Sequence, residues 1–216
     1  MTKAVKRKRN YNASLRQEQA LMTRQRIRDA ARRLLTQGTY SSVTMEEIAQ
    51  EAGVAYQTVY ATFGSKLQLA KDVIEEGFHF EAVEELAARA NAASDPEDGM
   101  RIGAELTRRI HEICADLLRF MRESGDPELL ARYHQSERMR LSQQAHIPAL
   151  LQRSGRLQPG LSESEVAAVL WAMTGTEFYS MLVFQQGWSP SRYEDWLGTA
   201  LIEVLLVPAE EVRAPT

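Results

Sequence analysis

The stretch TMEEIAQEAGVAYQTVYATFGSK, Thr44–Lys66, contains the signals for two short helices joined by a tight turn. Thr44 is a favourable N-cap residue, and Glu47 three positions later completes a capping box. Gly53 follows the last apolar position of the first helix, where a C-terminal cap favours a residue that tolerates positive φ. The stretch therefore predicts a helix that ends at a glycine turn and a second helix directly after it.

Apolar residues repeat at helical spacing on both sides of this turn. Small Ala49 stands where two steeply crossing helices approach closely, and Gly53 stands where the chain must turn sharply. These are the requirements of a helix-turn-helix motif. The residues expected to face inward are Met45, Ile48, Ala49, Ala52, Val54, Val59 and Phe63.

The run IAQEAGVAYQTVYATFGSK resembles the DNA-binding signature of TetR-family transcriptional regulators, roughly I-A-x-x-A-G-V-x-x-x-T-φ-Y-x-x-F-x-S-K with φ apolar. The match is specific because many positions are fixed within a short run. The resemblance includes the helix expected at roughly 24–37 and the start of the helix after the motif. Beyond about residue 85 it rests on length and helical pattern. The matching residues are Ile48, Ala49, Ala52, Gly53, Val54, Thr58, Val59, Tyr60, Phe63, Ser65 and Lys66.

This resemblance implies a sequence-specific DNA-binding transcriptional regulator in the bacterial cytoplasm. It implies a homodimeric repressor that a small-molecule effector releases from its operator, with no cofactor. The expected partners are a two-fold symmetric duplex operator, an unidentified effector and a second copy of the chain. A regulator without a small ligand, or an activator, remains an alternative. A helical adaptor that binds protein is an alternative from another class.

Composition fits a soluble globular protein, with 44% hydrophobic and 25% charged residues among 216. We expect no membrane partner, because no apolar run reaches the length of a membrane span and the basic start is not a secretory signal. The single cysteine, Cys114, excludes an internal disulfide framework and fits a reducing cytoplasm.

Charge divides the chain into a basic front and an acidic remainder. Residues 1–71 contain 13 Lys+Arg against 5 Asp+Glu, whereas residues 72–216 contain 13 against 24. The front is therefore expected to face a polyanion. Residues 1–13 have five basic residues, no acid and no apolar period, so we expect them to be disordered in the free protein. They are either an arm against DNA phosphates or a minor groove, or a solubilising tail.

The pattern of periodic segments predicts an all-α fold of about nine helices, without strand signals. Residues 1–22 are expected to be a basic N-terminal arm and helix lead-in, and residues 23–70 a three-helix helix-turn-helix DNA-binding domain. Residues 71–216 are expected to be a helical ligand-binding and dimerisation domain. The first helix is expected over 14–37, and a long helix over about 65–93 is expected to act as a lever between the domains.

Later helices are delimited by caps and breakers, of which residues 91–99, NAASDPEDG, are the clearest break. Prolines and capping residues mark the remaining ends. The expected helices run from this break to about Glu123, from Asp126–Pro127 until Pro148 kinks or stops the helix, from the capping box of Ser162 and Glu165 to about Gln186, and from Ser189–Pro190 to before Pro208.

The outward face of the second motif helix supplies the candidate DNA contacts. Gln57 can pair with an adenine edge, and Thr58 can bond a phosphate or place its methyl group against thymine. The resemblance implies that Tyr60 and Lys66 hold phosphates. Thr44 can present backbone N–H groups to a phosphate, which is compatible with a plain capping role. The predicted DNA-binding residues are Thr44, Ala55, Tyr56, Gln57, Thr58, Tyr60, Thr62 and Lys66.

This chain departs from many relatives on that outward face. Gln57 stands where they have Gly, and Tyr56 stands where they have a basic residue. The departures therefore put the usual operator sequence in doubt, rather than DNA binding.

The last two helices are apolar on nearly all sides and must be covered. A two-fold dimer that pairs them with their mates as a four-helix bundle would cover them. A monomer core is the alternative. The predicted interface residues are Val166, Val169, Leu170, Met173, Leu182, Trp196, Leu197, Leu201 and Val204.

The resemblance also implies an effector site in the C-terminal half, for which apolar residues with a few polar groups are available. Core packing or dimer contact is the alternative for each residue. Glu177, an acid amid apolar residues, either faces a ligand or pairs with an arginine across the dimer. The candidate effector-binding residues are Phe120, Met121, Tyr133, Trp171, Thr174, Glu177, Phe178 and Met181.

No pattern indicates an enzyme or a metal site. His111 and Cys114 lie three positions apart on one expected helix, but two ligands make a weak metal site. The chain has no HExxH or GxSxG motif and no phosphate-binding glycine-rich loop. We therefore expect no catalytic residue and no metal ligand.

Overall fold

The computed structural model describes residues 2–78 and 81–208, and these residues confirm the all-α fold. Within these ranges β-structure is limited to an isolated antiparallel bridge between Leu157 and Leu206. The chain divides into two compact units, which are described separately. Unit 1 comprises residues 1–77 and 123–125, and unit 2 comprises residues 78–122 and 126–216.

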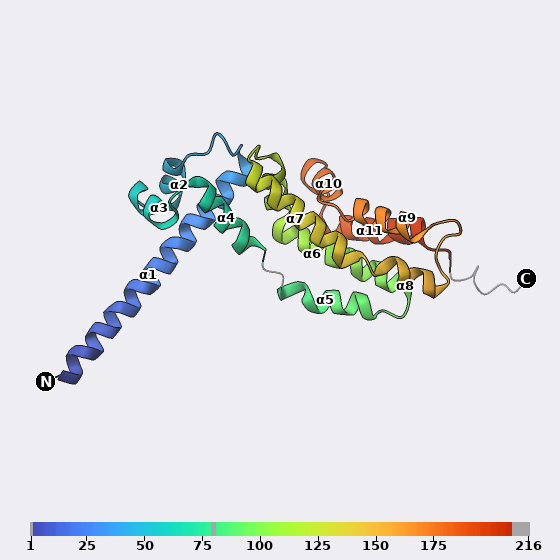
Figure 1. Ribbon diagram of the computed structural model, residues 1–216, viewed down its shortest axis with the longest axis horizontal. Coiled ribbons are helices and arrows are strands. Elements are labelled where there is room, and N and C mark those ends of the chain that lie inside the picture. Colours follow the sequence, from blue (N-terminus) through green and yellow to red (C-terminus); the bar gives the residue numbers. More distant parts are fainter. Residues whose placement is uncertain (1, 79–80, 209–216) are drawn as a thin grey trace, which may run out of the picture. The chain divides into compact units, whose positions relative to one another are not determined.

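Unit 1 is the helix-turn-helix unit that the motif predicts, and Figure 1 shows its helices in blue to green. Helix α1 packs against α2 and α4, and α3 packs against α2 and α4. Among the side chains of α1 that the structure describes, Ile27 is the first that is buried, and Ala30, Ala31 and Leu35 continue the stripe. The four helices are α1 (Thr2–Gln37), α2 (Met45–Ala52), α3 (Tyr56–Phe63) and α4 (Lys66–Gly77).

Helix α1 begins at Thr2, so the expectation of disorder over residues 1–13 is wrong for residues 2–13. Met1 and the side chains of residues 2–14 lie outside what the structure describes. The segment contains neither Gly nor Pro and is rich in Lys and Arg, which favour helices. Extending an existing helix also avoids the cost of nucleating a new one. The helix that starts at Ser14 by sequence is therefore the later part of a longer helix.

The predicted helix from about Ser65 to Ala93 is also wrong, because two helices occupy this range. Helix α4 ends at Gly77, Phe78 is in a turn, and α5 starts at Glu81. Glycine is about 1 kcal/mol less favourable than alanine inside a helix, which makes Gly77 a natural end. Helix α5 belongs to unit 2. A continuous lever helix is therefore not part of this fold.

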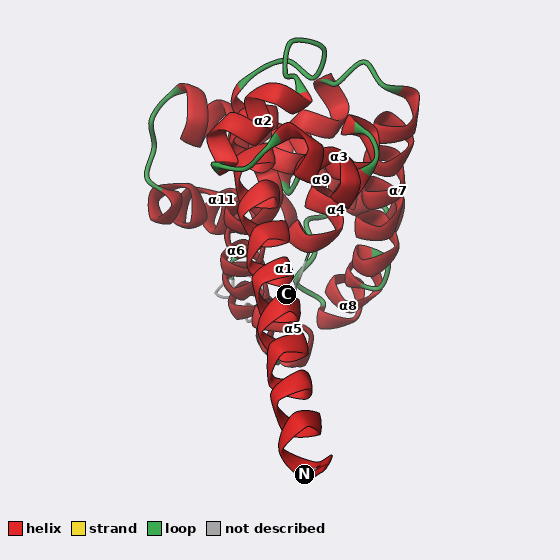
Figure 2. Cartoon of the chain, turned by 90° about the vertical axis from the view of Figure 1, so that its left-hand side faces the viewer, coloured by secondary structure: helices red, strands yellow, loops and turns green. Residues whose placement is uncertain are grey.

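Unit 2 consists of helices from α5 onward around a core in which Leu117, Met121, Tyr193 and Leu197 are fully buried. Figure 2 shows that helices also make up this part of the chain. The elements of unit 2 are α5 (Glu81–Ala92), α6 (Pro96–Glu123), α7 (Pro127–Gln144), α8 (Ile147–Ser154), α9 (Glu163–Met173), α10 (Thr176–Tyr179), the π-helical η1 (Ser180–Gln185) and α11 (Pro190–Leu205).

Capping signals located most helix starts of unit 2 correctly. The Asp126 side chain accepts hydrogen bonds from two backbone amides at the start of α7. Ser162 and Glu165 form the predicted capping box of α9, and Ser189 caps α11. Pro148 lies in the first turn of α8, after α7 has ended at Gln144. Each of these signals acts within a few residues, which is why sequence alone reveals it.

The predicted helix from Ser162 to about Gln186 is interrupted after Met173. Gly175 has an extended conformation (φ −72°, ψ 156°) and precedes α10. A Cβ atom on Gly175 would lie 2.8 Å from Glu177 Oε2 and 3.2 Å from the Ala172 carbonyl oxygen. The Thr174 hydroxyl donates to the Leu170 carbonyl at 2.7 Å and closes the end of α9. The interruption therefore occurs at a glycine whose added Cβ would crowd the Ala172 carbonyl oxygen, and α-helical periodicity does not reveal it.

The segment Glu163–Gln185 has a mean hydropathy of 1.3 and is, by length and composition alone, apolar enough to cross a membrane. The segment contains Glu163, Glu165 and Glu177 and is therefore not an unbroken apolar run, so the absence of a membrane partner stays a prediction. The core helix of a soluble protein passes the same test, and 39% of this hydropathy window is buried in the chain. The break at Gly175 also divides the segment into α9, α10 and η1.

Gly53→Ala is expected to destabilise unit 1 by about 1–2 kcal/mol, because Gly53 has φ 63° and its added Cβ would lie 3.0 Å from Arg26 Nη2. The matched control is Gly103→Ala inside α6, where a Cβ meets no atom within 4 Å. The control is expected to be neutral or stabilising by up to about 1 kcal/mol. Thermal unfolding by circular dichroism measures both; equal effects of the two changes would contradict the turn's role.

Candidate nucleic-acid interface and effector region

The start of α2 is fixed by a reciprocal capping box. The backbone N–H of Glu47 donates to the Thr44 hydroxyl at 3.2 Å, and the backbone N–H of Thr44 donates to Glu47 Oε2 at 2.8 Å. The hydrogen bonds from the Thr44 backbone and side chain lower the pKa of the Glu47 carboxyl. The cap expected from the sequence is confirmed, and a phosphate contact at exposed Thr44 stays a prediction.

Both the N–H and the carbonyl groups of the turn after α2 are hydrogen-bonded. The Gly53 N–H donates to the carbonyls of Ala49 and Gln50. Arg26 of α1 donates through Nη2 to the carbonyls of Ala52 (2.5 Å) and Gly53 (3.0 Å). From the sequence, Arg26 is one of several arginines expected either to meet phosphates or to lie on a solvated helix face, and its hydrogen bonds to the turn were not predicted. Arg26 thus satisfies carbonyls that a helix end leaves without intrahelical partners.

Helix α3 carries its candidate contacts at exposed positions beside its buried residues. Val59 and Phe63 are buried, whereas Tyr56 and Tyr60 are 40% and 57% exposed. The rings of these tyrosines are 6.3 Å apart, as expected one turn apart on a helix. Gln57 is exposed with them. The arrangement places two phenols and one amide on a short helix whose other face is fixed in the core.

The remaining predicted contacts of α3 are less accessible. Ala55 is exposed, but Thr58 and Thr62 are half-buried. The Thr62 hydroxyl donates to the Thr58 carbonyl at 2.6 Å, so it is engaged within the helix. Val54, which was expected inside, is only half-buried. Tyr56, Gln57 and Tyr60 therefore form the outward group that the structure supports best.

Lys66 has a structural role that the sequence did not predict. Its Nζ donates to the carbonyls of Tyr40 (2.6 Å) and Val43 (2.8 Å) and lies 4.4 Å from the centroid of the Tyr40 ring. Two of the three ammonium donors are therefore directed at the loop before α2. In this structure Lys66 positions the loop that leads to Thr44, and a phosphate contact by Lys66 stays a prediction.

The arginines of α1 are paired with carboxylates of unit 1. Arg24 forms an ion pair with Asp72 and lies 4.7 Å from the centroid of the Phe63 ring. Arg28 contacts Asp72 at 3.4 Å and also Glu76. Arg33 contacts Glu51 at 2.9 Å across an exposed surface. Exposed pairs of this kind contribute only about 0–1 kcal/mol each, so they mainly neutralise charge.

Part of the predicted effector set meets between α6, α7 and the α9–α10 break. Glu177 forms an ion pair with Arg122 of α6 and accepts a hydrogen bond from Tyr133 Oη at 3.2 Å. The Tyr133 pKa is raised by burial and by the Glu177 charge. Glu177 therefore has its arginine within the same chain, which corrects the idea of a partner across a dimer. We call Arg122, Tyr133 and Glu177 the Glu177 cluster.

A second polar group lies beside the same helix break. Arg140 donates to the Thr174 hydroxyl at 2.9 Å and to the Trp171 carbonyl at 2.8 Å. Gln144 donates to the same hydroxyl at 2.9 Å. The Arg140 guanidinium lies 5.4 Å from the centroid of the Trp171 ring, which is 42% exposed. Helix α7 thus holds the end of α9 through neutral and charged donors.

The other predicted effector residues are divided between core and surface. Phe120 and Met121 are buried in the core, and Met181 is 44% exposed. Phe178 packs against Trp196 with 5.6 Å between ring centroids. The eight residues therefore do not form one common lining.

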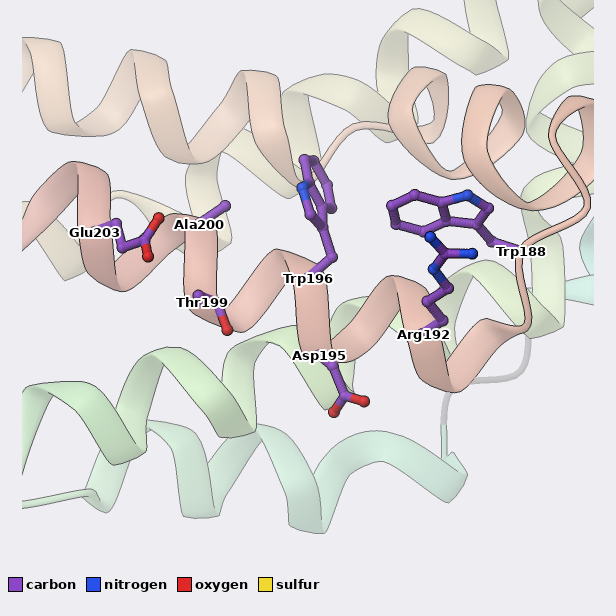
Figure 3. Close-up of a pocket in the computed structure, with 7 residues that line it drawn as sticks. All are labelled: Trp188, Arg192, Asp195, Trp196, Thr199, Ala200 and Glu203. Atoms are coloured by element: carbon purple, nitrogen blue, oxygen red, sulfur yellow. The ribbon is translucent and has the colours of Figure 1, made fainter.

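A groove of about 430 Å³ lies on the outer side of α11, and it contains none of those eight residues. Figure 3 shows the Arg192 guanidinium over the Trp188 ring, 4.0 Å from its centroid, with Trp196 nearby. Trp196 belongs to the predicted dimer interface. The lining residues are Trp188, Arg192, Asp195, Trp196, Thr199, Ala200 and Glu203.

Four predicted dimer contacts lie inside the chain's own core. Val166, Leu170, Leu197 and Leu201 are at most 3% exposed, which excludes them from a protomer surface and corrects their assignment. Burial follows from apolar periodicity, but periodicity does not tell which partner covers a residue. The predicted interface residues that retain exposed surface are Val169, Met173, Leu182, Trp196 and Val204.

Sequence reasoning missed a buried polar cluster around Tyr179. Its ring centroid lies 4.9 Å from that of His111 and 5.0 Å from that of Tyr193. His111 Nδ1, Ser180 Oγ and Tyr193 Oη are buried without a hydrogen-bond partner, which is rare in folded proteins. Burial lowers the pKa of His111 to about 3, and the Arg140 charge adds to the shift. His111 is therefore neutral at physiological pH.

The part of the chain that the structure describes contains no evident metal-binding site. Within residues 2–78 and 81–208, no group of three or more His, Cys, Asp or Glu side chains is arranged to hold an ion.

The helix-turn-helix unit matches a known family. Residues 27–73 match the family described as bacterial regulatory proteins, tetR family. The HTH-type transcriptional regulator AlkX of Mycobacterium tuberculosis is 26% identical over 151 residues, which cover 68% of this chain. The match spans 65% of AlkX's own length.

Solved structures share the fold over most of the chain. NalD, the secondary repressor of the MexAB-OprM multidrug efflux pump in Pseudomonas aeruginosa, has a TM-score of 0.62 and 22% identity, over 88% of this chain and 98% of NalD. FadR of Bacillus subtilis, solved in complex with stearoyl-CoA, has a TM-score of 0.62 and 16% identity, over 83% of this chain and 98% of FadR. At these identities the likeness concerns the fold alone.

The stability of unit 2 is expected to fall by about 1–2 kcal/mol between pH 6.5 and pH 5. Unfolded His111 binds a proton in this range, whereas folded His111, with its pKa lowered to about 3, does not. The contribution of neutral His111 to the stability of unit 2 is therefore fully present above pH 6.5, and it is lost as pH falls toward 3. Urea unfolding followed by tryptophan fluorescence measures it, because all three tryptophans lie in unit 2.

His111→Phe should abolish that pH dependence, while the control His134→Gln, at an exposed position, should keep it. An unchanged slope in His111→Phe would show that another group titrates.

Proposed function

Because the chain belongs, through residues 27–73, to the tetR family of bacterial regulatory proteins, we propose that it is a homodimeric repressor released from its operator by a small molecule. The proposed setting is the cytoplasm, and the partners are duplex DNA, an effector and a second copy of the chain. The similar proteins named above are regulators rather than enzymes, so no catalytic role is proposed.

The observation that carries the DNA-reading role is the outward group of α3. Tyr56, Gln57 and Tyr60 are exposed together on a helix whose ends are fixed by glycine turns. The major groove of B-DNA, about 12 Å wide, admits an α-helix. There, the Gln57 amide is suited to the N6/N7 edge of adenine, and the tyrosine hydroxyls are suited to phosphates. Thr44 remains a candidate for a phosphate contact through the start of α2.

The apolar surface that unit 2 leaves uncovered supports a two-fold dimer. Val204 of α11 is 46% exposed, and Met181 and Phe184 of η1 are each 44% exposed. Half-buried Trp196 connects this surface to the core through Tyr193, with 6.1 Å between ring centroids. An isologous contact would cover this surface and present two copies of α3 to half-sites about 34–36 Å apart.

The Glu177 cluster supports the proposed place of effector action. It connects α6 and α7 to α10 beside the Gly175 break, while Arg140 and Gln144 hold the end of α9. A ligand that prefers another arrangement of these helices would shift the population away from the DNA-binding form. A coupling of about 1–3 kcal/mol between effector and operator is typical of such regulators. FadR's stearoyl-CoA makes long-chain acyl-CoA a reasonable first probe.

Gln57→Ala is expected to weaken binding to a duplex selected from a random pool by about 5–150-fold, the equivalent of about 1–3 kcal/mol for a lost bidentate base contact. Binding to unrelated duplex is expected to stay within about two-fold, because phosphate contacts dominate nonspecific affinity. Fluorescence anisotropy with labelled duplexes measures both affinities.

The matched control for this change is Gln135→Ala, at an exposed position of α7 in unit 2. It is expected to bind like the original chain. Equal selected-site affinity for all three proteins would contradict base reading by Gln57, and no binding of duplex DNA by the original chain would contradict the proposed function.

Val204→Asp is expected to raise the dimer dissociation constant more than about 10-fold, which corresponds to about 1.4 kcal/mol, because the change places a charge in an apolar interface. Sedimentation equilibrium measures the change. Leu130→Asp is the control, since Leu130 of α7 is 37% exposed and lies outside the proposed interface. A dimer that tolerates Val204→Asp as well as the control would place the interface elsewhere.

A further inference from the structure

The first part of α1 extends beyond the packed body of unit 1. Residues 15–22 are all exposed, and from residue 15 onward the first buried residue of the helix is Ile27. We call residues 2–22 the α1 extension. As a continuous helix of 1.5 Å rise per residue, it is about 31 Å long. Figure 1 shows it running from α2 and α3 toward the N-terminus without another helix of unit 1 beside it.

The α1 extension carries a strong positive charge in its sequence. Five cations fall within residues 3–9, Arg16 adds a sixth, and Glu18 is the single acid in residues 2–22. This differs from the packed part of the helix, where Arg24, Arg28 and Arg33 are paired with carboxylates. The α1 extension does not contain enough acidic residues to pair with its own cations. The five cations are Lys3, Lys6, Arg7, Lys8 and Arg9.

The α1 extension leaves unit 1 next to the DNA-reading helix. Arg26 contacts the carbonyls of Ala52 and Gly53, which precede α3. Arg24 lies over the ring of Phe63, the last residue of α3. Arg24 and Arg26, which are two positions apart on α1, therefore contact the segments at the two ends of α3. The basic helix then continues from this point.

We propose that the α1 extension binds the phosphate backbone of the duplex outside the half-site that α3 reads. This inference rests on the proposed function and adds a second DNA contact to it. The contact concerns phosphates, because Lys and Arg side chains recognise a charged backbone without reading sequence. An α-helix, about 10 Å across, does not enter a minor groove about 6 Å wide, so the helical extension follows the backbone or the wider groove.

The size of the effect follows from counterion release. Each neutralised phosphate contributes about −0.9 to the slope of log K against log salt concentration. A dimer brings about ten cations in its two segments of residues 3–9. If half of them contact phosphates, the slope changes by about 4–5, which is several-hundred-fold in affinity between 50 and 200 mM salt.

The test replaces Lys3, Lys6, Arg7, Lys8 and Arg9 with glutamine, whose helix propensity is close to that of Lys and Arg. Affinity is measured from 50 to 200 mM salt on two duplexes, the selected site with 15 bp flanks and the same site without flanks. The original chain is expected to show the larger salt slope on the flanked duplex. The variant is expected to lose about 4–5 of that slope and to bind both duplexes alike.

The matched control removes the same number of charges from exposed positions of unit 2, so net charge changes equally. It is expected to keep the slope and the preference for flanked duplex. Circular dichroism checks that both variants keep their helix content. The control replaces Arg89, Arg101, Arg109, Arg138 and Arg153 with glutamine.

The outcomes separate this inference from the proposed function. A variant whose slope equals that of the original chain, or a control that loses as much slope as the variant, overturns the α1-extension contact and leaves operator binding intact. Failure of the original chain to bind any duplex overturns the proposed function itself.

Discussion

The reversal of the chain at Gly53 is the constraint on which the DNA-binding unit depends. The residue adopts φ 63°, a conformation in which a Cβ would be strained and would also meet Arg26. The same arginine ties the turn carbonyls to α1, the helix that provides Ile27 and its neighbours to the core. The turn thereby sets the direction of α3. Buried Val59 and Phe63 set its rotation, which leaves Tyr56, Gln57 and Tyr60 outward.

Unit 2 has a comparable constraint at Gly175, where the apolar segment is interrupted. The side chain of Glu177 occupies the space a Cβ at Gly175 would need, and it is held there by Arg122 and Tyr133. The π-helical segment begins a few residues later at Ser180, in the buried polar cluster around Tyr179. π-helical turns frequently occur at functional sites. A helix break, a charged cluster and unpartnered polar atoms therefore occur in one region of unit 2.

Local signals in the sequence predicted much of this structure, because caps and turns act within a few residues. Thr44 with Glu47, Asp126 and Ser162 all begin helices where expected. The exposed face of α3 also followed, since helical periodicity separates inside from outside. The helix end at Gly77 did not follow, because the apolar stripe continues beyond it.

Roles that depend on distant partners could not be predicted. Lys66 has the same charge whether it holds a phosphate or the carbonyls of Tyr40 and Val43. Glu177 required knowledge that Arg122 lies on a neighbouring helix. Periodicity marked Leu197 as apolar, but only packing shows that its own chain buries it. In each case the missing information is the identity of the neighbour in space.

Hydrogen–deuterium exchange of the full chain, with and without the duplex selected from a random pool, tests the central claim most directly. Exchange reports local opening along the whole backbone, so it locates the contact without a prior choice of residues. The account predicts that bound duplex slows exchange in peptides from residues 44–66. Unchanged exchange in those peptides, with protection confined to unit 2, would contradict it.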